Sequence, residues 1–211
     1  MSRKFYFAPV FLFVLSSFLF AQEADTSAAR SDTSIVLLKS VDSTIVTDVR
    51  YATANNFTGK VLYPTANVYL RKAPAEKLHE AERELMSKYN LRFKVFDGYR
   101  PLSVQKKLWE IMPDSRYVAN PKNGSRHNRG AAVDLTLIDS TGRELQMGTP
   151  YDDFTEKAHS DYKDLPENIL KNREILRDIM VKYGFEPLST EWWHFDYSGW
   201  QNYSILDEEI R

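Results

Sequence analysis

One carboxylate inside an apolar segment is the feature that most constrains the fold of this chain. Residues 131–137 read Ala-Ala-Val-Asp-Leu-Thr-Leu, and their alternation predicts a β-strand in which Asp134 lies between Val133 and Leu135. Burying an uncompensated charge costs several kcal/mol. The fold must therefore bring a metal, a hydrogen-bond donor or an arginine to Asp134.

The remaining pattern predicts an α+β domain with a central antiparallel sheet and flanking helices. Apolar residues recur at helical spacing in three segments, with Pro74 and Pro101 opening the first two and Gly184 capping the third. These segments are 74–90, 102–111 and 167–183. Alternation predicts further strands over 91–95 and 192–197, and Asp139–Gly142 predicts a hairpin turn that returns into 143–147.

The N-terminal segment predicts a secretory signal peptide. Arg3 and Lys4 precede an apolar run from Phe5 to Phe20, which is shorter than the roughly 20 residues that a spanning helix needs. We expect cleavage after Ala21, with an uncleaved anchor as the alternative. Residues 22–34 contain no large apolar side chain and predict a flexible leader, which leaves one domain over 35–211. The mature protein is then periplasmic or secreted, without stable membrane association.

Composition excludes several classes of function. The chain has no cysteine, so a metal site must use histidine and carboxylate ligands. The 28 basic and 29 acidic residues give a net charge of -1. Removing residues 1–21 takes away Arg3 and Lys4, and 26 minus 29 gives -3. Nothing in this charge balance favours nucleic acid as a partner.

Two short stretches concentrate side chains that bind metals and transfer protons, namely 125–134 and 191–194. His127, Asp134 and His194 can supply two nitrogen ligands and one oxygen ligand, which is a catalytic zinc pattern with a fourth position open for water. Glu191 is then available as a base, provided that it precedes the strand carrying His194, because residues three apart on a strand face opposite ways.

Each of these residues also has an ordinary structural explanation. A single histidine is more often a hydrogen-bonded structural or surface residue, Asp134 could pair with an arginine, and Glu191 could lie at the surface. The small residues Gly130–Ala132 would allow the chain to approach either a metal or a neighbouring strand closely.

The joint pattern resembles a known enzyme family. Ser125-x-His127-x-x-Gly130-x-Ala132-x-Asp134 and Glu191-x-Trp193-His194 resemble the signature of the zinc D-alanyl-D-alanine dipeptidases and the related D,D-carboxypeptidases. Three further segments are similar to the dipeptidases in particular: 51–59, 97–101 and 147–152. The resemblance extends over about 45–197.

This resemblance implies a hedgehog/D,D-peptidase-like sheet that carries one zinc ion per chain on His127, Asp134 and His194. It implies that Glu191 is the catalytic base and that Arg100 stabilises the transition state, where negative charge builds on the carbonyl oxygen. It also points to substrate contacts from Asp152, Tyr51 and Ser125. Asp153 could replace Asp152 in this role, and Tyr51 could instead be a core aromatic residue.

The implied activity is hydrolysis of D-alanyl-D-alanine to two D-alanines. An exported enzyme cannot remove the dipeptide in the cytoplasm before it enters a wall precursor, so recycling or scavenging of wall-derived dipeptide is the expected role. Two alternatives remain open. One is a D,D-carboxypeptidase or other murein peptidase acting on longer stem peptides, and the other is a non-catalytic, zinc-stabilised cell-wall binding module.

Overall fold

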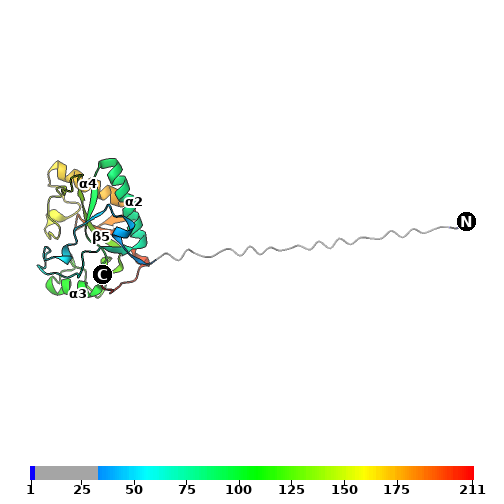
Figure 1. Ribbon diagram of the computed structural model, residues 1–211, viewed down its shortest axis with the longest axis horizontal. Helices are drawn as coiled ribbons and strands as arrows, with labels where there is room; N and C mark the ends of the chain where they lie inside the picture. Colours follow the sequence, from blue (N-terminus) through cyan, green and yellow to red (C-terminus); the bar gives the residue numbers. More distant parts are fainter. Residues whose placement is uncertain (3–32) are drawn as a thin grey trace. The chain divides into compact units, whose positions relative to one another are not determined.

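A five-stranded sheet runs through the domain in the computed structural model, which describes residues 1–2 and 33–211 (Figure 1). The strand order is β2-β4-β5-β7-β6, with every pair antiparallel except β2 and β4. The strands are β2 (Val46–Thr47), β4 (Arg92–Asp97), β5 (Ala132–Ile138), β6 (Phe185–Pro187) and β7 (His194–Tyr197). The predicted α+β class is confirmed, with a parallel pair at one edge of the sheet.

The helices lie in two groups around this sheet. α2 (Lys72–Tyr89) and α4 (Glu167–Lys182) pack against each other, whereas α3 (Leu102–Ile111) lies at the other end of the domain (Figure 1). A separate two-stranded antiparallel sheet pairs β1 (Ile35–Leu37) with β3 (Tyr69–Arg71), next to the one-turn helix α1 (Leu38–Val41). The 3-10 turns are η1 (Arg50–Ala52), η2 (His127–Arg129), η3 (Glu156–Ala158) and η4 (Trp200–Asn202).

Strand β5 is buried along its whole length. Val133, Leu135 and Leu137 belong to the hydrophobic core. Since side chains alternate across a strand, Asp134 projects from the opposite face. Both faces of β5 are therefore covered, one by apolar packing and the other by the polar groups described below.

The sequence predicted the long helices to within two residues at either end. The helix over 102–111 is confirmed as α3, and Gly184 follows α4 in the left-handed conformation, with φ 85°. Along α2, Leu78 and Leu85 are buried as apolar residues of a helix facing the core, whereas Glu82 is buried and Tyr89 is 37% exposed. The return over 143–147 makes an isolated bridge, Ile138 with Glu144, instead of a strand.

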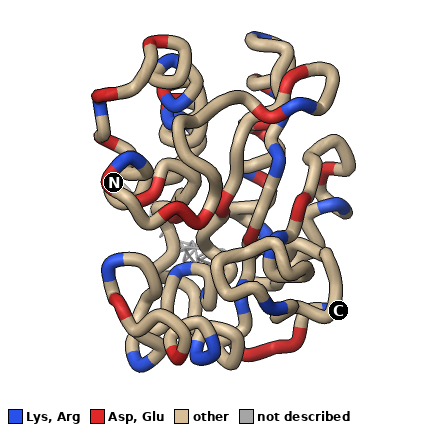
Figure 2. Tube along the Cα trace, turned by 90° about the vertical axis from the view of Figure 1, so that its left-hand side faces the viewer, with Lys and Arg blue, Asp and Glu red and all other residues tan. Residues whose placement is uncertain are grey.

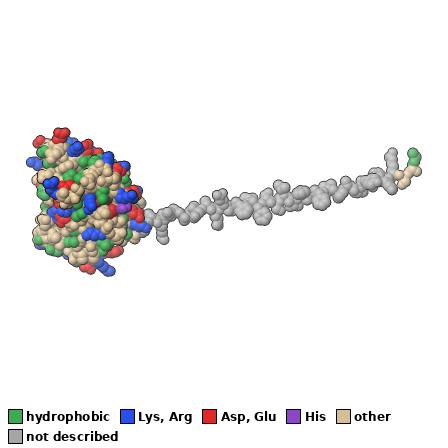
Figure 3. Space-filling view, turned by 45° about the horizontal axis from the view of Figure 1, so that its top comes forward, with side chains coloured by type: hydrophobic (Ala, Val, Ile, Leu, Met, Phe, Trp, Pro, Cys, Tyr) green, Lys and Arg blue, Asp and Glu red, His purple; other side chains and the backbone are tan. Residues whose placement is uncertain are grey.

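The signal peptide and most of the leader fall on residues 3–32, outside the described part of the chain. Within the described part, no helix is long and apolar enough to span a membrane. Figures 2 and 3 show charged residues of both signs interspersed over the domain, in keeping with its near-neutral composition.

Glu82 of α2 is a carboxylate that is fully buried against the core. Its Oε2 accepts a hydrogen bond of 2.8 Å from the backbone N–H of Phe93, while Oε1 is buried without a hydrogen-bond partner among the described residues. Burial raises the pKa of Glu82 from its ordinary 4.5 to about 7. The folded protein therefore binds a proton here that the unfolded chain releases between these two values.

This difference predicts that the contribution of Glu82 to stability is fully present below pH 4.5 and is lost as the pH rises through 7. The loss should amount to roughly 3 kcal/mol. Glu82→Gln keeps an acceptor for Phe93 without a charge. The wild-type free energy of unfolding should therefore fall relative to that of Glu82→Gln between pH 4.5 and 7.5, as measured by urea denaturation. Parallel pH curves for the two proteins would contradict this assignment.

Candidate active site

Strand register brings three ionisable side chains into one row. Asp134 of β5 pairs with His194 of β7 on one side and, after a register shift in β4, with Asp97 on the other. Directly paired residues project from the same face of a sheet. The row Asp97–Asp134–His194 thus follows from the hydrogen-bonding pattern of three central strands.

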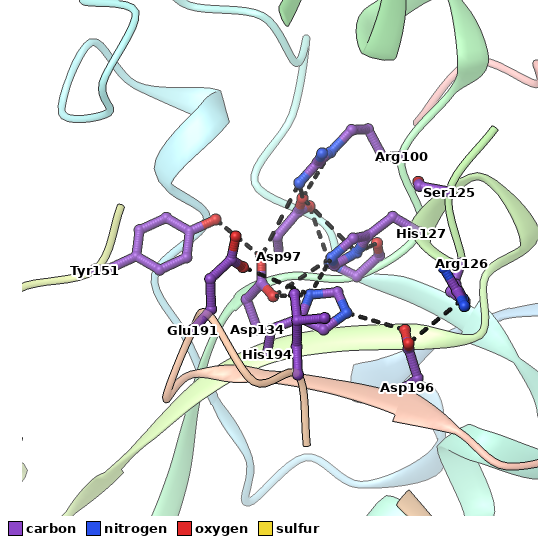
Figure 4. A network of polar contacts seen from close by, with 12 residues as sticks. Asp97, Arg100, Ser125, Arg126, His127, Asp134, Tyr151, Glu191, His194 and Asp196 are labelled. Carbon is purple, nitrogen blue, oxygen red and sulfur yellow. Dashed lines mark hydrogen bonds and ion pairs between the residues drawn. The ribbon is translucent and has the colours of Figure 1, made fainter. Parts of the chain in front are cut away.

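The predicted metal ligands converge at one end of this row (Figure 4). Asp134 Oδ1 lies 3.0 Å from His194 Nδ1 and 3.4 Å from His127 Nε2, and the two ring nitrogens are 3.2 Å apart. All three residues are buried. Within the described residues 1–2 and 33–211, these three side chains form the cluster of ligand-type groups that could hold a metal ion.

The opposite edge of each imidazole ring has its own acceptor. His127 Nδ1 donates to the carbonyl of Gly98 at 2.7 Å, and His194 Nε2 lies 2.9 Å from Asp196 Oδ1. When a metal is bound, these partners would hold the ring protons on the outer nitrogens and leave the inner nitrogens to coordinate it. Gly98 approaches β3 so closely that a Cβ would lie 2.8 Å from the carbonyl oxygen of Tyr69.

This donor set fits zinc. Two imidazole lone pairs and one carboxylate oxygen converge in a buried position, which is a zinc ligand set with room for a further ligand. Burial would lower the pKa of His194, but the hydrogen bonds that its ring donates to Asp134 and Asp196 raise this pKa well above its usual value. Burial would likewise raise the pKa of Asp134, yet the two histidines hold it far below its usual range. The position strongly favours positive charge.

A turn between α3 and β5 supplies His127 and Ser125. Ser125 N–H donates to Asn128 Oδ1, Asn128 N–H donates to Ser125 Oγ, and Asn128 Nδ2 donates to the carbonyl of Arg100. Gly130 ends the turn with φ 67°, and its carbonyl accepts the N–H of Arg71 in β3. The predicted close approach at Gly130 is confirmed, and its partner is a strand.

Arg100 is buried and fixed from two sides. Its Nε and Nη2 both donate to Asp97 Oδ2, at 3.0 and 2.7 Å, and its Nη1 donates to Gln105 at 3.0 Å. Burial would lower the pKa of Arg100, but the charge of Asp97 raises it well above its usual value. Tyr63 in turn donates to Asp97 Oδ1 at 2.8 Å. The guanidinium is thus held as a rigid cation beside the metal ligands.

Glu191 lies just before β7, where the predicted bend occurs. Trp192 and Trp193 form a turn, so that Glu191 Oε2 lies 4.0 Å from His194 Nδ1 on the same side of the sheet. The carboxyl group is buried, and this burial raises its pKa to about 8. Glu191 can therefore exchange a proton near neutral pH.

Asp152 and Tyr51 form a second acidic position in the cavity. Tyr51 Oη lies 3.3 Å from Asp152 Oδ2 and 3.4 Å from Oδ1. Burial, together with the negative charge of Asp134, raises the pKa of Asp152 to about 7. Asp152 has φ 60°, a left-handed conformation that is uncommon outside glycine and asparagine or aspartate. The prediction named Asp153 as an exchangeable neighbour, but Asp153 caps Thr155 and only Asp152 lines the cavity.

One cavity of about 150 Å³ brings together all the site residues that the sequence predicted. They are Tyr51, Arg100, Ser125, His127, Asp134, Asp152, Glu191 and His194. Sequence reasoning missed the residues that hold them, notably Asp97, Tyr151 and Asp196. Asp97 and Tyr151 lie within the motifs 97–101 and 147–152. The sequence therefore showed a carboxyl group and a hydroxyl group at these positions, but gave no reason to assign either of them a role.

The other histidines lie elsewhere. His79 Nδ1 is 2.7 Å from Asp42 Oδ2, which links α2 to the residue after α1. His159 contributes its backbone carbonyl, which accepts a hydrogen bond from Arg173. The described structure gives neither imidazole a place in the cavity.

Comparison with known proteins gives one consistent result. A family model described as D-Ala-D-Ala dipeptidase matches residues 31–209. A D-alanyl-D-alanine dipeptidase of Escherichia coli (strain K12) is 36% identical over 163 residues, covering 77% of this chain and 84% of the relative. A D-alanyl-D-alanine dipeptidase of Enterococcus faecium is 33% identical over 172 residues, covering 70% and 83%.

Solved structures give more distant matches. The vancomycin-resistance D,D-dipeptidase VanXYg, in complex with a D-Ala-D-Ala phosphinate analogue, is 22% identical with a TM-score of 0.40. That match covers 64% of this chain and 52% of the solved chain.

Proposed function

This chain belongs to the D-Ala-D-Ala dipeptidase family, and on that premise we propose that it is an exported zinc dipeptidase that cleaves D-alanyl-D-alanine into two D-alanines. The observation that carries the proposal is the single cavity of about 150 Å³ that contains the metal-binding group, Glu191, Arg100 and Asp152 together. The residues fit the family's chemistry one by one, and the size of the cavity favours a small substrate.

The metal site sets the place of reaction. His127, Asp134 and His194 would hold the zinc, which when bound supplies Lewis acidity to the scissile carbonyl and to the attacking water. Glu191, whose carboxyl group faces the same cavity, takes a proton from that water and returns it to the departing amine. Arg100 faces the same cavity and stabilises negative charge on the carbonyl oxygen.

The substrate's free ammonium group binds at Asp152 and Tyr51. A buried carboxylate needs a positive partner, and the ammonium of a dipeptide supplies one. Ser125 lines the same cavity and contacts the dipeptide from the side of His127. This arrangement distinguishes a dipeptidase from an enzyme acting on longer stem peptides, in which the corresponding nitrogen is an uncharged amide.

Glu191→Gln tests the proposed base. The amide keeps the shape of the side chain but cannot accept a proton, so the rate of D-alanine release should fall about 10²–10⁴-fold or more. Zinc content, measured by atomic absorption, should stay at one ion per chain. A variant that retains zinc and most of its activity would show that another group is the base, and activity that resists chelators would contradict the metal mechanism.

The acidic position at Asp152 predicts a requirement for a free amino group. D-Ala-D-Ala should be hydrolysed, whereas N-acetyl-D-Ala-D-Ala and a stem pentapeptide ending in D-Ala-D-Ala should be cleaved at least 100-fold more slowly, as measured by D-alanine release. Efficient cleavage of the pentapeptide would favour the carboxypeptidase alternative. Cell-wall affinity of the zinc-loaded protein without hydrolysis of any substrate would favour the binding module.

Export rests on the N-terminal sequence, in which Arg3 and Lys4 precede an apolar run that ends at Ala21. An exported dipeptidase meets dipeptide released from the wall, and it therefore serves recycling or scavenging. We expect N-terminal sequencing of the protein from the exported fraction to begin at Gln22. Recovery of the protein in the cytosol would reverse this part of the proposal.

A further inference from the structure

A buried hydroxyl contacts the side of Asp134 that faces away from the two histidines. Tyr151 Oη donates to Asp134 Oδ2 at 3.0 Å, whereas Asp134 Oδ1 faces His127 and His194 (Figure 4). We propose that Tyr151 is a positioning residue of the metal centre, which holds Asp134 so that Oδ1 alone is presented to the zinc.

The two oxygens of Asp134 have different surroundings. A carboxylate can bind a metal through one oxygen or through both, and the choice depends on what else its oxygens contact. Arg100 Nη2 lies 4.0 Å from Oδ2, beyond hydrogen-bond distance, because it is held by Asp97. The Tyr151 hydroxyl is therefore the hydrogen-bond donor that occupies Oδ2 among the described residues.

The ring of Tyr151 is held firmly enough to orient a neighbour. It is 9% exposed and packs edge-on against Trp193, with ring centroids 5.4 Å apart. It also packs in a tilted arrangement against Phe96, with centroids 4.8 Å apart. Trp193 directly precedes His194 in the chain. The same ring thus contacts the segment that carries one metal ligand while its hydroxyl binds another.

The backbone around Tyr151 is fixed by a buried arginine. Arg173 of α4 donates to the carbonyls of Met147, Lys157 and His159, at 2.7, 2.8 and 2.9 Å. These bonds span the segment 147–159, which also contains Asp152. The position of Tyr151, and through it that of Asp134, is therefore coupled to the segment that we assign to the substrate's ammonium group.

The inference rests on the zinc site of the proposed function, but not on the substrate. Its test is the zinc affinity of the full chain, measured by competition with a chromophoric chelator in the absence of peptide. Tyr151→Phe removes the hydroxyl and keeps the ring. Tyr183→Phe is the matched control, because Tyr183 also donates to a carboxylate, that of Glu84 on α2, and neither residue lines the cavity.

We expect the zinc dissociation constant to rise about 10-fold in Tyr151→Phe and to stay within twofold of wild type in Tyr183→Phe. The visible spectrum of the cobalt-substituted protein should change only in Tyr151→Phe, since the geometry of the carboxylate ligand alters. Near-ultraviolet circular dichroism checks that both variants are folded. Unchanged affinity in Tyr151→Phe, or an equal loss in both variants, would overturn the proposal. A protein that binds zinc without cleaving the dipeptide would refute the proposed function and leave this test valid.

Discussion

The buried charge of Asp134 is the constraint on which the rest of the site depends. Asp134 lies in the middle of a fully buried strand. Its ionised carboxylate is stable there only if other groups compensate for the hydration that it loses on burial. Compensation comes from every side: two imidazole nitrogens face one oxygen, and a tyrosine hydroxyl binds the other. The pairing of β5 with β7 places His194 beside Asp134, whereas His127 comes from the turn before β5 and Tyr151 from the segment after it.

A second buried carboxylate, that of Asp97, holds the guanidinium group of Arg100 in place. Asp97 receives hydrogen bonds from Arg100, Tyr63 and the N–H of Gly98, so that both of its oxygens are occupied. The carbonyl of Gly98 then accepts a hydrogen bond from His127. A single turn at the end of β4 thereby sets the position of the guanidinium and the tautomer of a metal ligand. This explains why Asp97 and Gly98 accompany Arg100 in the sequence.

Periodicity predicted the long helices and the central strands, because it is a local property. Residue type and spacing pointed to the metal ligands and Glu191, whereas the other four cavity residues were named only through the resemblance to the family. Asp134 could be recognised as needing a partner, but the sequence left metal and arginine as alternatives. The supporting residues depend on register across strands, which local spacing does not encode. Asp97 lies opposite Asp134 only because of the register shift in β4, whereas Asp196 projects from the same face as His194 because the two lie two residues apart on β7.

The balance of charge in the cavity links metal binding to substrate binding. Asp134, Asp152 and Glu191 lie in one buried cavity, and the raised pKa values of Asp152 and Glu191 show that their negative charges disfavour one another and disfavour burial. Arg100 is paired with Asp97, and a protonated His194 offsets one carboxylate, so ionisation of all three cavity carboxylates leaves an excess of negative charge. A dication beside Asp134 and an ammonium beside Asp152 each remove part of that excess. A bound zinc ion and a substrate ammonium group would both lower the electrostatic cost of placing three carboxylates in one cavity, as the proposed function requires.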